Sequence, residues 1–480
     1  LPTGGGQNSV DFVASGTLSS GQTVTLKADG TVEVVAETSI SQTVGSPTTY
    51  LSSAQYFNEA TYDTTNNKVV ISYVSNAYPY AVVGTVSGTS ISFGSPIIIA
   101  PSTYAENLVS AFDTSNGKVI FSFQNKSNSY YGASVVGTVS GTSISFGSIV
   151  IFNSGYTSYP KSTYDSTNNR VIVIYKDNGD SDYGKAVVGN VSGTSISFGS
   201  ESTFNSGTQG QAQCITFDTA AGKAVIAFEN GSNSSYGTAI VGTVSGTNIS
   251  FGSAVIFNSN GTYSVGAAYD SISNKTIIAI RDHNGGNWQG AAFVSTISGT
   301  TISFGAKSVY ASAVNNVNYI SVTYDPNADK SLILWRHGAA PYSGKARPVT
   351  VSGTSLALES EVTFESGGTS YIGSTFDPDT NQIVIAFRDD ADSNYGKSVI
   401  FRNASTATNS ADFIGITAEA ISDTATGPVN VYGGINEAQT GLTIASDYYV
   451  QADGSLSTTV STVKAGQAIS ATTINLMDLT

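Results

Sequence analysis

Ser87-Gly88-Thr89-Ser90-Ile91-Ser92-Phe93-Gly94 is an eight-residue stretch that recurs letter for letter at 140–147 and at 192–199. Variants of this stretch follow at 245–252, 298–305 and 352–359. The glycines at their second positions, 88, 141, 193, 246, 299 and 353, are 53, 52, 53, 53 and 54 residues apart. A fixed period of this length is typical of repeat architectures, in which each copy folds as one supersecondary unit. The sequence therefore predicts a chain of similar units in series.

A second repeated feature is an aromatic residue followed by aspartate. It occurs seven times, with the aspartates at Asp63, Asp113, Asp165, Asp218, Asp270, Asp325 and Asp377. Each begins a polar turn such as 63–67, and an Asp side chain stabilises such turns by accepting hydrogen bonds from the backbone that follows. We expect these aspartates to be structural. A third feature is an aromatic residue close to glycine, as in Tyr131-Gly132 and Tyr183-Gly184.

Each period contains four short segments with strand character. Between 195 and 244 these are Ser195–Phe198, Ala212–Phe217, Ala224–Phe228 and Ala239–Val244. Continuous apolar, β-branched runs indicate strands buried on both faces, and Ser-Gly between alternating segments indicates a tight hairpin. Four strands in about 50 residues, repeated in series, are typical of a β-propeller. The fold class is therefore all-β.

The count of segments predicts how the propeller closes. There are seven aromatic-Asp units but six Ser-Gly-Thr strands, so one strand is missing from the last unit. The alternating stretch Thr38–Ser41 stands at the right interval before Tyr62-Asp63 to supply it. We therefore expect a seven-bladed propeller over 38–402, closed by an N-terminal strand. An open solenoid, the alternative, would gain nothing from such an offset.

The two flanks read as small β-modules. Residues 1–37 contain a hairpin with an Asp29-Gly30 turn and are expected to be an attachment segment, and 403–480 contain a second hairpin, turning at Asp453-Gly454, within a small β domain. Closure should bring the two flanks together. The first residues lack the basic and apolar regions of an intact secretory signal, which was removed or never used.

Composition narrows the partners. Charged residues make up 11% of the 480, the net charge is −14, and no run approaches 18 apolar residues. Basic clusters that would follow phosphates are missing, so nucleic acid and anionic membranes are poor partners. With 49 aromatic residues and few charges, the chain does not have the composition of a disordered protein.

Charges that break the repeat are the candidates for ligand recognition. Three arginines hold equivalent positions in successive units, and convergent arginines in a propeller suggest carboxylate binding. Tyrosine and tryptophan beside the variable loops are typical of recognition surfaces and stack on sugar rings. The candidate ligand-binding residues are Tyr183, Arg281, Asp282, Trp288, Arg336, Tyr342, Arg388 and Asp389.

Other chemistry receives less support from the sequence. The Asp-rich loops 177–182 and 389–394 contain oxygen ligands suited to Ca²⁺, but an ordinary polar hairpin explains them better. His283 and His337 lie in neighbouring units without an evident third metal ligand. Cys214 lies in a strand-like run and is expected to be a small buried residue. We therefore expect no catalytic residues, no metal and no cofactor.

The repeat also carries a family resemblance. Val-Gly-Thr-Val-Ser-Gly-Thr-Ser-Ile-Ser-Phe-Gly at 136–147, with the turn that begins at Tyr164-Asp165, resembles repeats in virion structural proteins of tailed bacteriophages, notably phages of marine bacteria and cyanobacteria. The flanking stretches 11–18 and 441–454 are similar to small β-modules of such proteins. The resemblance implies a non-enzymatic component of the particle: a tail or head fibre, a decoration protein or a receptor-binding adhesin. The matching positions are all scaffold, so the resemblance assigns no functional residue.

Three functions follow as hypotheses. The first is a virion surface protein that is a homo-oligomer, contacts other virion proteins through its flanks, and presents the propeller to a host surface glycan or receptor. The second is a secreted or cell-surface lectin or an extracellular filament subunit. The third is a glycan-processing enzyme on the same scaffold.

Overall fold

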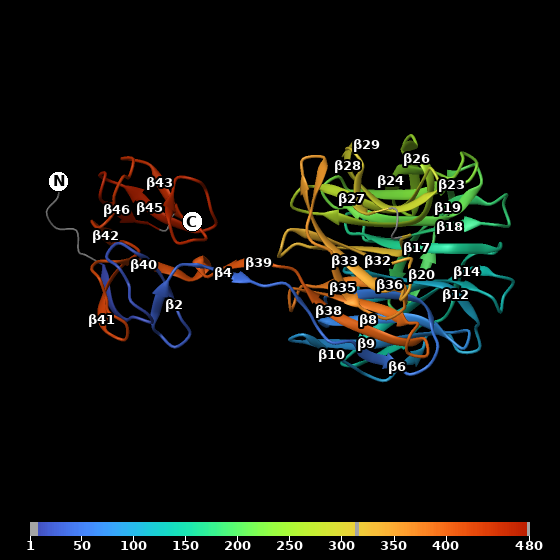
Figure 1. Ribbon diagram of the computed structural model, residues 1–480, viewed down its shortest axis with the longest axis horizontal. Coiled ribbons are helices and arrows are strands. Elements are labelled where there is room, and N and C mark those ends of the chain that lie inside the picture. Colours follow the sequence, from blue (N-terminus) through green and yellow to red (C-terminus); the bar gives the residue numbers. More distant parts are fainter. Residues whose placement is uncertain (1–7, 313–315, 478–480) are drawn as a thin grey trace. The chain divides into compact units, whose positions relative to one another are not determined.

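The computed structural model describes residues 8–312 and 316–477 (Figure 1). The chain forms two compact bodies. We call residues 42–403 the repeat body, and we call the described parts of 1–41 and 404–480 together the flanking body. Almost all regular structure is β-strand, and the described residues contain a single short 3₁₀ turn, η2 (Ser410–Asp412). No helix among them is long and apolar enough to cross a membrane.

Each repeat of the repeat body is a small antiparallel sheet. In the third repeat, β17 (Thr157–Asp165), β18 (Arg170–Asp177), β19 (Tyr183–Ser192) and β20 (Ser195–Phe198) pair in this order, from the innermost strand to the outermost. A further strand, β21 (Ser202–Asn205), pairs with the other half of β19. The middle strands are almost entirely buried, as their continuous apolar sequences predict.

The other repeats follow the same order. Repeat 1 contains β7 (Tyr56–Asp63), β8 (Lys68–Ser75), β9 (Tyr78–Ser87), β10 (Ser90–Phe93) and β11 (Ile97–Ile98), and repeat 2 contains β12 (Ala105–Asp113), β13 (Lys118–Asn125), β14 (Tyr131–Ser140), β15 (Ser143–Phe146) and β16 (Val150–Asn153). Repeat 4 contains β22 (Gln209–Asp218), β23 (Lys223–Asn230), β24 (Tyr236–Ser245) and β25 (Asn248–Phe251), and repeat 5 contains β26 (Val255–Asp270), β27 (Lys275–Asn284), β28 (Asn287–Ser298), β29 (Thr301–Phe304) and β30 (Ser308–Ala311). Repeat 6 contains β31 (Asn318–Asp325), β32 (Lys330–Arg336), β33 (Gly344–Ser352), β34 (Ser355–Leu358) and β35 (Val362–Glu365), and repeat 7 contains β36 (Thr369–Asp377), β37 (Gln382–Asp389) and β38 (Tyr395–Arg402). The sheets of repeats 4 and 5 are continuous, because β26 pairs with β24 as well as with β27. Small antiparallel sheets of this kind arranged in series make the repeat body a β-propeller.

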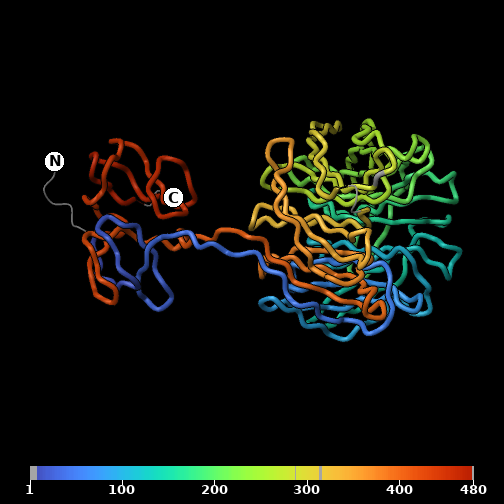
Figure 2. Tube along the Cα trace, viewed as in Figure 1, coloured from blue at the N-terminus to red at the C-terminus, as the bar shows by residue number. Residues whose placement is uncertain are grey.

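An early segment completes repeat 7, but it is not the predicted one. The strands that pair with β38 are β5 (Thr43–Val44) and β6 (Thr48–Leu51), which Figure 2 shows as a blue segment beside an orange one. The prediction that Thr38–Ser41 does this was wrong. Residues 37–40 form β4 (Glu37–Ile40), which pairs with β39 (Ser405–Thr408) in the flanking body. The reason lies at Gly45, which takes the place of the glycine in Phe-Gly and so sets the register.

That glycine explains the most regular feature of the repeat. A Cβ built on Gly147 would overlap the backbone oxygen of Thr194 in the next repeat, and Gly94, Gly199, Gly252 and Gly305 meet the equivalent threonines in the same way. Gly45 meets Thr89 of repeat 1. The Phe-Gly end of one repeat and the Ser-Gly-Thr turn of the following one are thus in direct backbone contact, and a side chain at the glycine would separate them.

The repeated aspartates are structural, as predicted. Asp165 is fully buried, and its carboxylate accepts hydrogen bonds from the backbone N–H groups of Thr167 and Asn168, both at 2.9 Å. Equivalent bonds fix the turns at the other six aspartates. These turns form one face of the repeat body, which we call the turn face.

Apolar clusters join neighbouring repeats into one core. Phe121 of repeat 2 packs with Val70 of repeat 1, and Ile172 of repeat 3 packs with Phe228 of repeat 4. A cluster of the same kind contains Val384 and Ile400 of repeat 7 together with Ile71 of repeat 1. The core therefore lies between the sheets, which need apolar side chains on both faces.

The two sequence flanks share one body. β1 (Ser9–Val13), β2 (Thr23–Leu26) and β3 (Val32–Val34) form a sheet with β40 (Phe413–Thr417) and β41 (Thr426–Val431). A second sheet contains β42 (Ile435–Asn436), β43 (Asp447–Val450), β44 (Leu456–Ser457), β45 (Lys464–Ala468) and β46 (Ile474–Leu476). The N-terminal hairpin is thus half of a domain that the C-terminal segment completes.

Candidate functional site

The innermost strands share an irregularity near their first residues. In β17 the pairing with β18 is interrupted between Ser158 and Lys161, and all seven innermost strands are interrupted at the equivalent place. At five of these bulges a residue other than glycine has a positive φ, between 51° and 55°: Phe57, Asn107, Tyr159, Tyr319 and Tyr371. Such a conformation costs about 1–3 kcal/mol at each residue, and bulges of this kind redirect side chains.

The redirected side chains surround a cavity of about 300 Å³ at the innermost strands. Its aromatic lining comes from Phe57, Tyr159, Tyr263, Tyr319 and Tyr371, and its amide lining comes from Asn58, Asn107, Gln211 and Gln213. The aromatic residues come from repeats 1, 3, 5, 6 and 7, and the amide residues come from repeats 1, 2 and 4. An aromatic wall with interspersed amide groups suits a ligand that has both flat apolar faces and hydroxyl groups.

A second cavity of about 150 Å³ lies further along the same strands and shares Glu59, Val109 and Lys161 with the first. Burial raises the pKa of the Glu59 carboxyl, and the positive charge of Lys161 partly opposes this rise. Cys214 lines the second cavity and is 7% exposed, so the prediction of a small buried residue is confirmed. Burial raises the pKa of its thiol to about 12.

The larger cavity is at the end of the strands opposite the turn face. Innermost strands begin beside it and end at the aspartate turns. The connections of the repeat body to the rest of the chain are on the turn face, where Thr43 pairs with Arg402 and the Asn403 amide donates to Asp325 at 2.8 Å. We call the end with the cavity the cavity face.

Arg281, one of the predicted ligand-binding residues, lies on this face at the end of β27. Its guanidinium stacks on Trp288, 3.9 Å from the ring centroid, and donates to Asn318 and Asn316 at 2.9 Å. Burial lowers the pKa of Arg281, and the nearby charge of Arg336 lowers it further. Trp288 in turn contacts His283, at 4.1 Å between ring centroids, and Tyr263, at 5.1 Å.

Arg336 and Arg388 occupy equivalent places in the next two repeats. The Arg336 guanidinium lies 4.9 Å from the Tyr319 ring and 5.4 Å from the ring of Tyr342, which is 46% exposed. That of Arg388 lies 4.8 Å from the ring of Tyr371. Tyr319 and Tyr371 contact each other at 4.9 Å. Arg336 and Arg388 therefore lie behind two tyrosines that line the cavity, and Trp288 and Arg281 lie behind a third, Tyr263. Tyr342 contacts Arg336 and does not line the cavity.

The two predicted aspartates have a different role. Asp282 is fully buried, and its carboxylate accepts hydrogen bonds from Lys307 and Gln289 at 2.9 Å and from Asn258 at 3.0 Å. Burial would raise the pKa of Asp282, but these hydrogen bonds outweigh it and the pKa is lowered. Asp389 is 5% exposed and accepts a hydrogen bond from Lys397 at 2.8 Å. Both carboxylates therefore bind lysine side chains of the protein itself.

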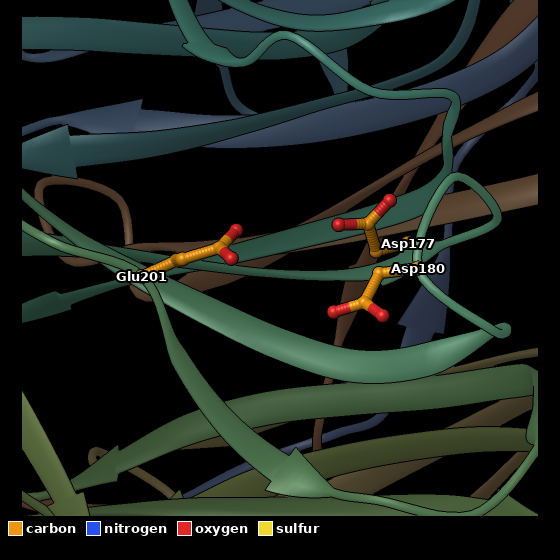
Figure 3. A group of neighbouring side chains, drawn as sticks. All are labelled: Asp177, Asp180 and Glu201. Carbon is orange, nitrogen blue, oxygen red and sulfur yellow. The ribbon is translucent and has the colours of Figure 1, made fainter.

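Tyr183 lies apart from this group. It begins β19 and pairs with Asp177, and it is not among the residues that line the cavities or stack on the arginines. Nearby, the carboxylates of Asp177, Asp180 and Glu201 lie within 4.8 Å of one another (Figure 3). Lys185 binds Asp180 and Glu201 at 2.6 Å. The Lys185 ammonium offsets one of the three negative charges, and the cluster is an ion-pair network within repeat 3.

The sequence did contain a signal for the bulge residues that we overlooked. Phe57, Tyr159, Tyr319 and Tyr371 each stand six residues before the aspartate of their repeat. The sequence therefore shows an aromatic residue at a fixed distance from the aspartate. It does not show the direction of that side chain, which depends on the bulge. His283 stacks on Trp288, and among the described residues neither His283 nor His337 belongs to a group of potential metal ligands.

Comparisons with known proteins give matches among solved structures alone. No family model and no curated protein matches the chain. Among solved structures, the C-terminal WD40 domain of Sif2 is similar, with a TM-score of 0.41 and 12% identity over 75% of this chain and 99% of that one. SapL1 lectin in complex with alpha methyl fucoside is similar with a TM-score of 0.41 and 12% identity, over 65% of this chain and 97% of that one. At this level of similarity neither structure indicates a ligand for this chain.

Proposed function

We propose that the repeat body is a seven-bladed propeller, closed between repeats 7 and 1, that binds a saccharide at the cavity face without transforming it. Closure is supported by three contacts: the pairing of β5 with β38, the shared core of Val384 and Ile71, and the approach of Gly373 to Glu59. A closed ring gives the seven innermost strands one common axis, and this is where the cavity lies.

The observation that carries the binding proposal is the ring of bulges. Five residues hold a strained backbone so that aromatic and amide side chains reach the same cavity. Strain of this kind persists where the surrounding structure enforces it, and it clusters at functional sites. Aromatic faces stack on the apolar faces of sugar rings, and amides bind their hydroxyl groups. A cavity of about 300 Å³ is at the lower end of the range for small-ligand sites.

Binding without catalysis is favoured by the distribution of carboxylates. Glycoside hydrolysis usually needs two carboxylates that flank the scissile bond. Among the described residues that line the two cavities, Glu59 is the one carboxylate, and it lies near Lys161. Asp282 and Asp389, which would be the alternatives, are bound to lysines.

The experiment is a glycan array with the intact chain, followed by calorimetric titration of the best ligand. Tyr371→Ala should weaken binding about 10-fold or more, because stacking of one aromatic face contributes on the order of 1–3 kcal/mol by analogy with base stacking. Tyr104→Ala is the matched control, since Tyr104 is 48% exposed, contacts Tyr78 edge to face and is not among the residues that line the cavity. Equal loss in both variants, or release of hydrolysis products from the ligand, would contradict the proposal.

We further propose that the protein is a surface component of a tailed-phage virion and assembles with other virion proteins through its flanking body. The support is the sequence resemblance of the repeats and flanks. The alternative is a secreted or cell-surface lectin. Antibody labelling of purified particles tests the proposal: labelled tails or heads support it, whereas an export signal in the gene, with protein found only in the medium, would refute it.

A further inference from the structure

Two of the three arginines on the cavity face form no ion pair with an acidic residue that the structure describes. Arg281 donates to the amide oxygens of Asn316 and Asn318, and Arg336 donates to the hydroxyl of Ser370 at 3.2 Å. Within the described residues neither guanidinium forms an ion pair, although acidic residues outnumber basic ones by 34 to 20 in the whole chain. Because half-buried charges are normally paired, two such groups together are unusual.

The two guanidinium groups are neighbours. Asn318 pairs with Arg336 across β31 and β32, and its side chain accepts a hydrogen bond from Arg281. One asparagine thus connects them, and the charge of Arg336 lowers the pKa of Arg281. Their Nε atoms are buried without a hydrogen-bond acceptor among the described residues. The protein therefore leaves two adjacent, like-charged donors incompletely satisfied, which costs stability unless an anion binds there.

Arg388, at the equivalent position in repeat 7, does have an acidic partner. It has the same aromatic packing, on Tyr371 and Tyr56, but its Nε donates to Asp390 at 2.6 Å. Comparing the three arginines separates the aromatic packing, which they share, from the acidic partner, which they do not share. Aromatic stacking alone is common to all three repeats, whereas the absence of a carboxylate partner distinguishes Arg281 and Arg336 from Arg388.

The arginine pair continues into the wall of the cavity. Tyr319 lines the cavity with one side and lies 4.9 Å from the Arg336 guanidinium. Tyr263 also lines the cavity, and it contacts Trp288, on which Arg281 stacks. A ligand whose ring lies in the cavity would consequently reach the guanidinium groups with a substituent of that ring.

We propose that the ligand is an acidic saccharide, whose ring lies against Tyr319 and Tyr371 and whose anionic group binds Arg281 and Arg336. This inference rests on the proposed saccharide binding and deepens it. Guanidinium groups bind planar carboxylates and tetrahedral sulfates through paired N–H donors. The anion would supply the negative charge that the described fold does not place beside these two side chains.

The test compares oligosaccharides that differ in one charged group. Calorimetric titration uses a glucuronic acid oligosaccharide, its neutral glucose counterpart and a sulfated glucose counterpart, each with the intact chain. The acidic ligands should bind about 10- to 100-fold more tightly than the neutral one, the range expected for charge-assisted hydrogen bonds. Raising the salt concentration from about 0.05 to 0.5 M should reduce this preference.

Variants assign the preference to residues. Arg281→Gln and Arg336→Gln should each remove most of it, and Arg336→Lys should retain part of it because the charge remains. Arg170→Gln is the matched control: it removes the same charge on the turn face, where Arg170 donates to the backbone oxygens of Gly246 and Asn169, and it should leave the preference unchanged within about 3-fold. The melting temperature of every variant shows whether the fold is intact.

The outcomes distinguish this inference from the proposed function. If neutral and acidic ligands bind equally in the wild-type chain, or if Arg170→Gln removes the preference as fully as Arg336→Gln does, the arginine pair is not an anion site although saccharide binding stands. If no saccharide binds at all, the proposed function fails as well. The wild-type comparison decides the matter even if every variant unfolds.

Discussion

At the scale of single residues, charge is sparse because each charged side chain needs a partner within the fold. Asp282 is fully buried and pairs with Lys307, Lys185 pairs with Glu201, and Asp389 pairs with Lys397. The sequence identified Asp282 and Asp389 as exceptions to the repeat. It could not show that each has a lysine partner, because Lys307 is 25 residues away from Asp282. Of the charged exceptions, Arg281 and Arg336 remain open to a ligand.

The ion pair of Asp282 predicts a stability effect that depends on pH. Lys307→Met should lower the free energy of unfolding by about 2 kcal/mol at pH 7, because it leaves a buried carboxylate with two neutral donors. The folded-state pKa of Asp282 is lowered, so its ionised form stabilises the fold above the unfolded pKa of about 4, and this contribution is lost as the pH falls. The deficit of the variant should therefore shrink between pH 5 and pH 3.

Urea denaturation at pH 7 and at pH 3 measures this effect. Lys126→Met is the control, since Lys126 pairs with Glu106 where both side chains are at least one-third exposed, and it should cost less than about 1 kcal/mol. A deficit of Lys307→Met that is the same at pH 7 and pH 3 would refute the electrostatic explanation.

At the scale of strands and turns, most of the fold could be predicted from local sequence. The four strands of each repeat, the aspartate turns and the Ser-Gly hairpins all follow from patterns within a few residues, and Gly193 has the positive φ, 61°, that its hairpin requires. What could not be predicted was the register of the segment at 38–51. Thr38–Ser41 and Thr43–Val44 both alternate, and a contact with Thr89, far away in sequence, decides between them.

The contact between Phe-Gly and the next Ser-Gly-Thr turn predicts the effect of a single methyl group. Gly199→Ala should destabilise the protein by about 1–3 kcal/mol, because the new Cβ would overlap the backbone oxygen of Thr247 and force two repeats apart. Ser200→Ala, at an exposed neighbouring position, should change the stability by less than about 0.5 kcal/mol. Thermal unfolding of both variants provides the comparison, and equal stability would mean that the repeats do not meet as described.

At the scale of the whole molecule, closure determines whether the innermost strands share one axis. If repeat 7 packs on repeat 1 as the other repeats pack on one another, Gly45→Ala should be as destabilising as Gly199→Ala, since its Cβ would overlap the oxygen of Thr89. In an open array, Gly45 would lie at a free end and its substitution would have almost no effect. Thermal unfolding again distinguishes the two.

The candidate site is the part that depends most on the whole molecule. The sequence identified the arginines, Trp288 and Tyr342 from their positions in the repeat. The bulge residues Tyr319 and Tyr371 were missed, because equivalent positions form one cavity only when the innermost strands of all repeats assemble. Residues from seven innermost strands meet there, and no local pattern encodes such a meeting.

The most direct measurement is a crystal structure of the intact chain with the tightest-binding saccharide of the array. We predict that the sugar ring occupies the cavity against Tyr319 and Tyr371, with its anionic group within hydrogen-bonding distance of Arg281 and Arg336. A saccharide bound on the turn face or on the flanking body, with the cavity free of it, would contradict the central claim.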